Sequence, residues 1–235
     1  MTTGPGGAPA QHRSGRMGGM EGELFPRAPR EIAPGAVHLP DWLGAEEQRE
    51  LLRECRGWAR PPAGLRTVRT PGGGTMTARQ VCLGWHWYPY GYARTVVDGD
   101  GAPVKPFPAR LGELGRRAVA DALGAPAARD AAYDIALVNF YDADARMGMH
   151  RDSDEQADAP VVSLSLGDTC VFRFGTTRGR TRPWTDVELR SGDLFVFGGP
   201  SRLAYHGVPR VHPGTAPPEL GLTGRLNVTL RVSGL

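Results

Sequence analysis

The chain has 235 residues, a length that allows one large domain or two small ones, and its net charge is only +3. Its 33 glycines and 21 prolines argue against an all-helical protein, because these residues interrupt helices and mark turns. Lys105 is the single lysine and precedes Pro106, which excludes a P-loop nucleotide site with its Gly-Lys-Ser/Thr sequence.

The first half of the chain is predicted to combine a tail with two helices. Residues 1–22 hold seven glycines and no apolar pattern, which predicts a disordered tail ahead of a single domain over residues 23–235. Apolar side chains recur on one face from Ala45 to Trp58 and from Pro108 to Leu123, which predicts two amphipathic helices. Between them, three glycines and a proline at residues 70–75 predict a hairpin turn.

An aromatic segment lies between the predicted turn and the second helix. Residues 85–92 hold five aromatic side chains in eight positions. Pro89 and Gly91 interrupt this segment, which favours a chain that folds back on itself as a lid over one flat strand. The alternative is an ordinary core strand.

The second half of the chain is predicted to be a β core. Short β-rich runs, separated by turn signals such as Ser191-Gly192-Asp193, indicate a sandwich or barrel. The fold class is therefore α+β, with a mixed layer over residues 23–133, a β core over residues 134–235 and a loop at 212–224. The predicted strands are Ile135–Tyr141, Val161–Leu166, Cys170–Phe174, Val187–Leu189, Leu194–Phe197 and Leu226–Val232.

Two histidines and an aspartate are candidates for a metal site. His150 and Asp152 are two positions apart, so in extended backbone their side chains point to the same face. His206 follows 56 residues later. Two histidines and one carboxylate that leave open positions form the facial triad of non-haem Fe(II) oxygenases. The alternative for His206 alone is a buried structural histidine.

The C-terminal run Arg225–Arg231 alternates between polar and apolar residues. The apolar face can pack in a core, whereas the two terminal arginines would be very costly to bury without partners. A guanidinium group suits bidentate capture of a carboxylate, so this polar face is predicted to line a wet or anion-binding site. The alternative is an exposed edge strand with solvated arginines.

Together these motifs resemble the AlkB family of Fe(II)- and 2-oxoglutarate-dependent dioxygenases, which dealkylate nucleic-acid bases. The resemblance covers about residues 23 to 235 and is nearest to the bacterial DNA-repair branch. The motifs that carry it are Asn139-Phe140-Tyr141, His150-Arg151-Asp152, Ser201-Arg202-Leu203-Ala204-Tyr205-His206-Gly207 and Arg225-x-Asn227-x-Thr229-x-Arg231.

The resemblance implies a double-stranded β-helix, or jelly roll, with flanking helices and an N-terminal nucleotide-recognition lid. It implies that Fe(II) is bound by His150, Asp152 and His206. It also implies O₂ as oxidant and a set of residues that bind 2-oxoglutarate, namely Asn139, Tyr141, Arg225, Asn227 and Arg231.

The implied substrate is alkylated DNA, with oxidative demethylation of bases such as 1-methyladenine and 3-methylcytosine as direct-reversal repair. By resemblance, Trp85 and Tyr92 contact the base and Asp154 lies beside its reactive edge. The family also carries a basic residue that contacts nucleic acid after the stretch ending at Gly175, and here Arg178 and Arg180 are the candidates.

Several alternatives remain open from the sequence. The same chemistry could act on RNA or tRNA, on protein or on a small molecule, and a metal-free module could bind alkylated nucleic acid without turnover. A cupin-like metal protein would have no use for the two terminal arginines. The aromatic segment and the arginine-rich residues 53–79 and 173–182 favour nucleic acid.

The compartment is predicted from the cysteines and from the apolar runs. Cys55, Cys82 and Cys170 are far apart and odd in number, which predicts a reducing compartment. No apolar run approaches the length of a membrane span, and residues 1–20 have no apolar stretch of the kind found in a secretion signal. We therefore expect a cytoplasmic protein without membrane contact, and a monomer.

Overall fold

The structure, a computed structural model, describes residues 1–2, 26–70, 72–129 and 131–235. The predicted tail over residues 1–22 thus lies almost entirely outside the described residues. Within the described residues, the strands form three antiparallel sheets, and no helix combines the length and the apolar character needed to cross a membrane.

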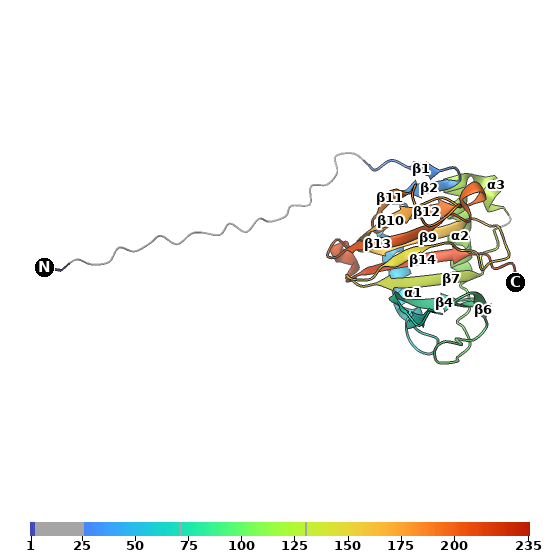
Figure 1. The fold of residues 1–235 in the computed structure, drawn as a ribbon, viewed down its shortest axis with the longest axis horizontal. Coiled ribbons are helices and arrows are strands. Elements are labelled where there is room, and N and C mark those ends of the chain that lie inside the picture. The colour runs from blue at the N-terminus through green and yellow to red at the C-terminus, as the bar shows by residue number, and fades with distance from the viewer. Residues whose placement is uncertain (3–25, 71, 130) are drawn as a thin grey trace.

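The major sheet has eight strands in the order β1-β2-β12-β9-β14-β7-β4-β3, and Figure 1 shows most of them stacked in this order. Its strands come from both sides of residue 134, because β2 pairs with β12 and β4 pairs with β7, while β1 and β3 extend the sheet at its two edges. Their bounds are β1 Arg30–Ala33, β2 Ala36–Leu39, β3 Arg66–Arg69, β4 Thr75–Leu83, β7 Ile135–Tyr141, β9 Val161–Gly167, β12 Leu194–Phe197 and β14 Arg225–Arg231.

The minor sheet has four strands in the order β11-β10-β13-β8, and it faces the major sheet to complete the predicted jelly roll. Its strands are β8 Met147–His150, β10 Thr169–Phe174, β11 Thr185–Leu189 and β13 His206–His212. The third sheet is a hairpin of β5 His86–Tyr88 and β6 Gly91–Ala93, which confirms that the aromatic segment folds back.

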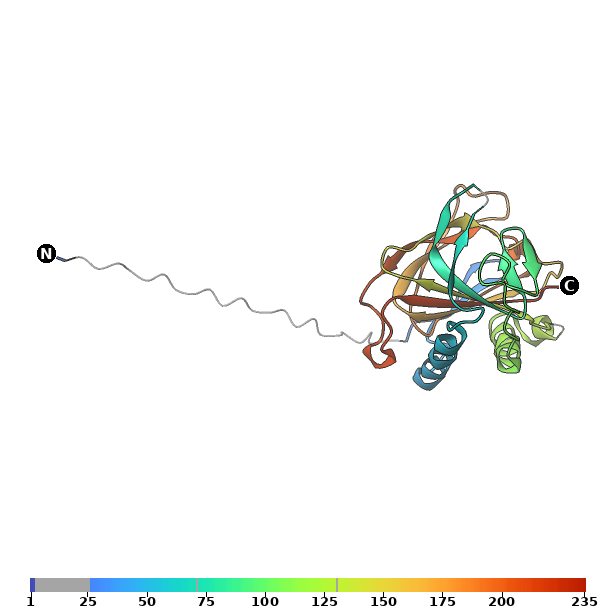
Figure 2. The ribbon, with the colours of Figure 1, turned by 90° about the horizontal axis from the view of Figure 1, so that it is seen from below.

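Two helices cover the outer face of the major sheet (Figure 2). Helix α1 spans Ala45–Trp58 as predicted, and α2 spans Ala109–Leu123, one residue later than predicted because Pro108 is its N-cap. A short helical turn, α3 Ala125–Ala128, follows α2, and single 3₁₀ turns lie at Gly199–Ser201 and Pro218–Leu220.

Alternation along β14 separates the two sides of the major sheet. Leu226, Val228 and Leu230 join the core cluster under α1 and α2, whereas the residues between them face the minor sheet. Between the sheets, four phenylalanines from β10 and β12 contact one another with ring centroids 4.9–6.3 Å apart. The apolar side of the strand therefore builds the core, and its polar side is left for the site.

Strand β13 is the main element that the sequence does not predict. Gly207 and Pro209 lie inside it, and both residue types argue against a central strand. The ladder with β10 has a bulge between Val171 and Arg173, opposite Pro209, so the missing N–H of this proline disrupts no regular pairing. Strands β1, β2 and β8, with only four residues each, are likewise absent from the predicted strands.

Asp193 anchors the start of the domain to β12. Its buried carboxylate accepts hydrogen bonds from Arg27 at 2.6 and 2.8 Å, from His38 at 2.9 Å and from the backbone of Asp41 and Arg190. Burial would raise the pKa of this carboxyl, but the hydrogen bonds from His38 and Arg27 outweigh it and lower the pKa to about 2.

This pKa shift predicts a specific loss of stability in acid. A carboxyl whose pKa falls from 3.8 to about 2 on folding stabilises the protein by about 2 kcal/mol above pH 4, and this contribution is lost as the pH falls from 4 to 2. Urea unfolding should show that Asp193→Asn removes this part of the pH dependence. The control, Asp186→Asn, breaks an exposed pair with Arg173 and should cost at most about 1 kcal/mol.

Candidate metal centre and substrate cavity

A cavity of about 560 Å³ opens between the inner faces of the two sheets. Strands β7 and β14 supply one wall, strands β8 and β13 supply the other, and residues of the β5–β6 hairpin complete it. The polar face of β14 lines this cavity, and β14 is a central strand of the major sheet, so it is not the solvated edge strand considered from the sequence. The residues of this face are Arg225, Asn227, Thr229 and Arg231.

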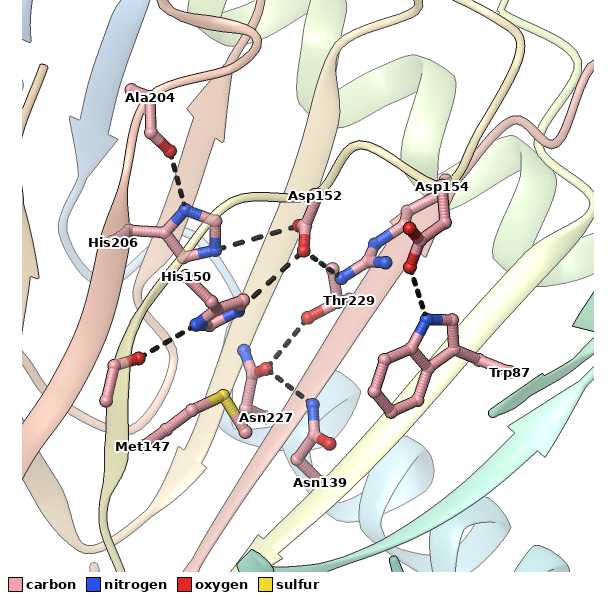
Figure 3. Close-up of polar contacts among 12 residues, drawn as sticks. Trp87, Asn139, Met147, His150, Asp152, Asp154, Ala204, His206, Asn227 and Thr229 are labelled. Carbon is pink, nitrogen blue, oxygen red and sulfur yellow. Dashed lines mark hydrogen bonds and ion pairs between the residues drawn. The ribbon is translucent and has the colours of Figure 1, made fainter. Parts of the chain in front are cut away.

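His150, Asp152 and His206 come together inside this cavity (Figure 3). His150 ends β8 and lies opposite His206 at the start of β13, so the pairing of these strands brings the two histidines together in space although they are far apart in sequence. The Nε2 atoms of the two histidines lie 3.7 and 3.6 Å from the carboxylate of Asp152. One ligand atom from each residue lies within 4.8 Å of the others, a spacing that suits a single metal ion.

Backbone carbonyls orient both imidazole rings toward this point. The Nδ1 atom of His150 donates to the Gly148 carbonyl and that of His206 to the Ala204 carbonyl, each at 3.0 Å. Each Nε2 atom is thereby left with its lone pair for a metal. Burial and the neighbouring His150 lower the pKa of His206 to about 4, so His206 is neutral near pH 7.

Asp152 keeps its charge although it is only 4% exposed. Burial raises the pKa of this carboxyl, but Arg231, whose Nη2 atom lies 2.6 Å from Oδ1, and the two histidines lower it to about 2. The second oxygen, Oδ2, is buried and has no hydrogen-bond partner among the described residues. A buried anionic oxygen without a partner, between two imidazole lone pairs, fits a metal cation.

Glu155 pairs with both of the arginines that contact Asp152. Its two oxygens bind Arg231 at 2.9 Å and Arg202 at 3.0 Å. Arg202 in turn donates to the backbone carbonyl of Asp152 at 2.7 Å. The side chain and the backbone of the aspartate are thus both fixed by arginines that share one buried carboxylate.

Arg225 is a buried cation at a different place on the cavity wall. Its side chain is 1% exposed and donates to the Ser165 hydroxyl at 2.9 Å and to the Asp168 carbonyl at 3.4 Å. Its Nε atom has no hydrogen-bond partner, and no carboxylate among the described residues pairs with it. A buried guanidinium without an anionic partner fits the carboxylate of a 2-oxo acid.

Two further predicted cofactor residues, Asn139 and Asn227, belong to a row of hydrogen-bonded polar side chains along the cavity (Figure 3). Gln80 donates to Asn139 at 3.0 Å, Asn139 to Asn227 at 3.3 Å, and Thr229 to the same Asn227 oxygen at 2.8 Å. Tyr141 also lines the cavity, and its hydroxyl contacts the sulfur of Met147 at 3.6 Å. The donor set therefore fits both Fe(II) and 2-oxoglutarate.

The predicted substrate residues are only partly brought together. Asp154 lines the cavity and accepts a hydrogen bond from the indole of Trp87 at 2.8 Å. Trp85 and Tyr92 do not line it, which differs from the sequence prediction. Trp85 lies under the Arg94 guanidinium and donates to Asp134. The hydroxyl of Tyr92 is hydrogen-bonded to Glu155, whose carboxylate also pairs with Arg231.

A bend at Gly84 accounts for the position of Trp85. Gly84 has a φ of +81°, and an added Cβ would lie 1.9 Å from the Asp134 carbonyl oxygen, so the chain turns sharply before β5 begins. Trp85 therefore falls before the strand, and Trp87, inside β5, lines the cavity. The run of aromatics indicated the segment, but it carried no signal for which ring faces inward.

The arginine-rich stretches behave differently from each other. Arg180 lines the cavity mouth and lies 5.9 Å from the ring of Tyr205, whereas Arg178 is exposed and is absent from the lining. In the stretch 53–79, Arg53 and Arg56 belong to α1, which covers the opposite face of the major sheet. The basic surface near the cavity is therefore smaller than the sequence counts indicate.

Comparison with known proteins agrees with this geometry. The family model of the 2OG-Fe(II) oxygenase superfamily matches residues 35–231. An Alpha-ketoglutarate-dependent dioxygenase AlkB homolog of Caulobacter vibrioides is 37% identical over 209 residues, which cover 86% of this chain and 90% of the relative. The chain belongs to the AlkB family of 2OG-Fe(II) oxygenases.

Plant relatives of the AlkB family are similar as well. The DNA N(6)-methyladenine demethylase ALKBH1D of Arabidopsis thaliana is 33% identical over 221 residues, or 85% of this chain. The chain spans about half the length of this relative. The solved structure of OsALKBH1 superposes with a TM-score of 0.75 at 34% identity and covers 86% of this chain and all of that one. Fe(II), 2-oxoglutarate and O₂ are the requirements of this oxygenase family.

The metal centre predicts a binding experiment that needs no turnover. Titration calorimetry with Mn²⁺, which replaces Fe(II) without oxidation, should show one site in the wild-type protein. His150→Ala and Asp152→Ala should each weaken binding by more than about 100-fold, because even outer partners of metal ligands are worth about 10–100-fold. The control, His212→Ala, removes a histidine from the far end of β13 and should bind as the wild type does. Equal affinity in the Asp152 variant would refute the assignment.

Proposed function

We propose that the chain is an Fe(II)- and 2-oxoglutarate-dependent dioxygenase that oxidatively demethylates alkylated bases in DNA. The observation that carries the proposal is one cavity that combines the His150, Asp152 and His206 cluster, the unpaired guanidinium of Arg225 and an aromatic wall. The names of the relatives support the substrate class, since they include AlkB homologues and DNA N(6)-methyladenine demethylases.

Different residues of the cavity would bind the metal and the co-substrate. His150, Asp152 and His206 would hold Fe(II), and Arg225 would pair with a carboxylate of 2-oxoglutarate, with Asn139, Tyr141 and Asn227 beside it. Arg231 would keep Asp152 ionised and in place through the carboxylate contacts of its two Nη atoms, and its buried Nε, which has no partner among the described residues, would be left to help hold the co-substrate. When bound, Fe(II), 2-oxoglutarate and O₂ together supply the oxidising power that hydroxylates an N-methyl carbon.

The aromatic wall would receive the base. A base inside a duplex cannot reach a buried metal, so it must be flipped out or presented in a single strand. Trp87 offers an indole face, and Asp154 offers a carboxylate within hydrogen-bond distance of that indole. A cationic base such as 1-methyladenine or 3-methylcytosine suits this pair, because cation–π attraction and a negative charge both favour it.

The enzyme would act as a monomer on DNA in the cytoplasm. All groups of the site come from one chain, which supports action as a monomer. The three cysteines are buried and unpaired, which supports the reducing conditions of the cytoplasm. The cationic mouth at Arg180 supports contact with the phosphates of DNA, and the same chemistry on RNA is the alternative that an experiment must separate.

Loss of the methyl group is the direct test. Protein with Fe(II) and 2-oxoglutarate should remove the methyl mass from oligodeoxynucleotides that carry 1-methyladenine or 3-methylcytosine, as followed by mass spectrometry together with succinate. N6-methyladenine in DNA and the same methylated bases in RNA are the comparison substrates. Asp152→Ala should abolish methyl loss because it removes a metal ligand. Succinate formation without methyl loss from any of these substrates would refute demethylation.

Arg225 predicts a defect in co-substrate use. A charge-assisted contact is worth about 1.5–3 kcal/mol, so Arg225→Ala should raise the KM for 2-oxoglutarate by about 10-fold to 150-fold. Steady-state succinate formation at varied 2-oxoglutarate measures this change. The matched control is Arg173→Ala, which removes a guanidinium that pairs with Asp186 at the surface. An unchanged KM in the Arg225 variant would remove this residue from the binding site.

A further inference from the structure

The tip of the β5–β6 hairpin carries an aromatic ring in an unusual position. Tyr90 is 82% exposed, more than any other aromatic side chain among the described residues. It nevertheless lines the mouth of the cavity. Its φ is +71°, in the left-handed region that side chains with a Cβ avoid.

The turn at this tip would be easier to form with a different residue. Tyr88 pairs with Gly91, so Pro89 and Tyr90 form a two-residue connection. Proline first and a positive φ second are the pattern of a type II turn, whose second central position normally holds glycine or asparagine. Residues kept in such a conformation cluster at functional sites, where the surrounding structure holds them in place.

The hairpin below this ring is firmly fixed. The buried His86 bonds to Asp98 at 2.6 Å, and Arg66 donates to the Trp87 carbonyl at 2.6 Å. The Trp87 indole donates to Asp154 at the cavity wall. An exposed ring on so rigid a support loses little conformational freedom when a flat partner stacks on it.

We propose that Tyr90 is a stacking platform for the base next to the one that enters the cavity. This inference rests on the proposed function. Trp87 and Asp154 line the cavity itself, whereas the ring of Tyr90 is open to solvent at its rim and is accessible from outside. Arg151 and Arg180 also line the mouth, so the strand that leads to this ring passes cations that suit its phosphates.

The proposal predicts that Tyr90 matters for oligonucleotides and not for single nucleotides. Binding is measured with Mn²⁺ and 2-oxoglutarate present, by fluorescence anisotropy of a labelled trinucleotide with central 1-methyladenine and by its displacement with 1-methyladenosine monophosphate. Tyr90→Asn keeps a residue that tolerates positive φ but removes the ring. It should reduce the preference for trinucleotide over mononucleotide by about 5-fold to 150-fold, equivalent to 1–3 kcal/mol at 1.4 kcal/mol per tenfold.

Further variants separate stacking from turn geometry. Tyr90→Phe keeps the ring and should keep the preference, and Val97→Ala removes an exposed apolar side chain beyond the hairpin and should leave it unchanged. Thermal unfolding should show Tyr90→Asn to be at least as stable as the wild type, because the strained position is relieved. Full trinucleotide preference in Tyr90→Asn would overturn the inference alone. A wild-type protein that binds no methylated oligonucleotide would overturn the proposed function as well.

Discussion

The carboxylate of Asp152 is buried and still charged, because the Nη2 atom of Arg231 lies 2.6 Å from it. Removing an ion from water has an effective penalty of several kcal/mol, which only close and well-bonded partners offset. The second arginine, Arg202, and the carboxylate of Glu155 bring this buried group to two positive and two negative charges. A change in any member leaves a buried charge unpaired, so the metal site and the stability of the cavity wall depend on the same contacts.

Strand β14 carries both Arg231, which belongs to this buried charged group, and Arg225, the proposed partner of the co-substrate, on its cavity face. Arg225 and Arg231 are six residues apart, an even number, so both face the cavity, and along an extended strand they lie about 20 Å apart. This separation gives the two cations different partners. Arg231 pairs with two carboxylates of the protein, whereas Arg225 has only neutral oxygens near it. One strand therefore provides a structural cation and a cation that is free to bind an anion.

The sequence predicts best where side-chain alternation and local spacing determine the outcome. The bounds of β7 agree with the prediction, and the polar face of β14 lines the cavity as its alternation indicates. Contacts across the chain are different, since nothing local to Glu155 indicates that it joins Arg202 to Arg231. Local irregularities of the backbone are also missed, as with the bulge opposite Pro209 and the bend at Gly84 that precedes Trp85.

The β5–β6 hairpin and the metal site are connected through one short loop, residues 152–155. Asp152 holds the metal position, Asp154 accepts the Trp87 indole, and Glu155 accepts the hydroxyl of Tyr92. The β5–β6 hairpin is thus hydrogen-bonded to the same loop, residues 152–155, that contains the metal-binding candidate Asp152. A base that donates a hydrogen bond to Asp154 competes with the Trp87 indole for one carboxylate, and the displaced N–H must find a new acceptor. In the proposed function, entry of a base with a suitable donor would therefore act on the β5–β6 hairpin directly, while Arg231 and Arg202 keep Asp152 in position.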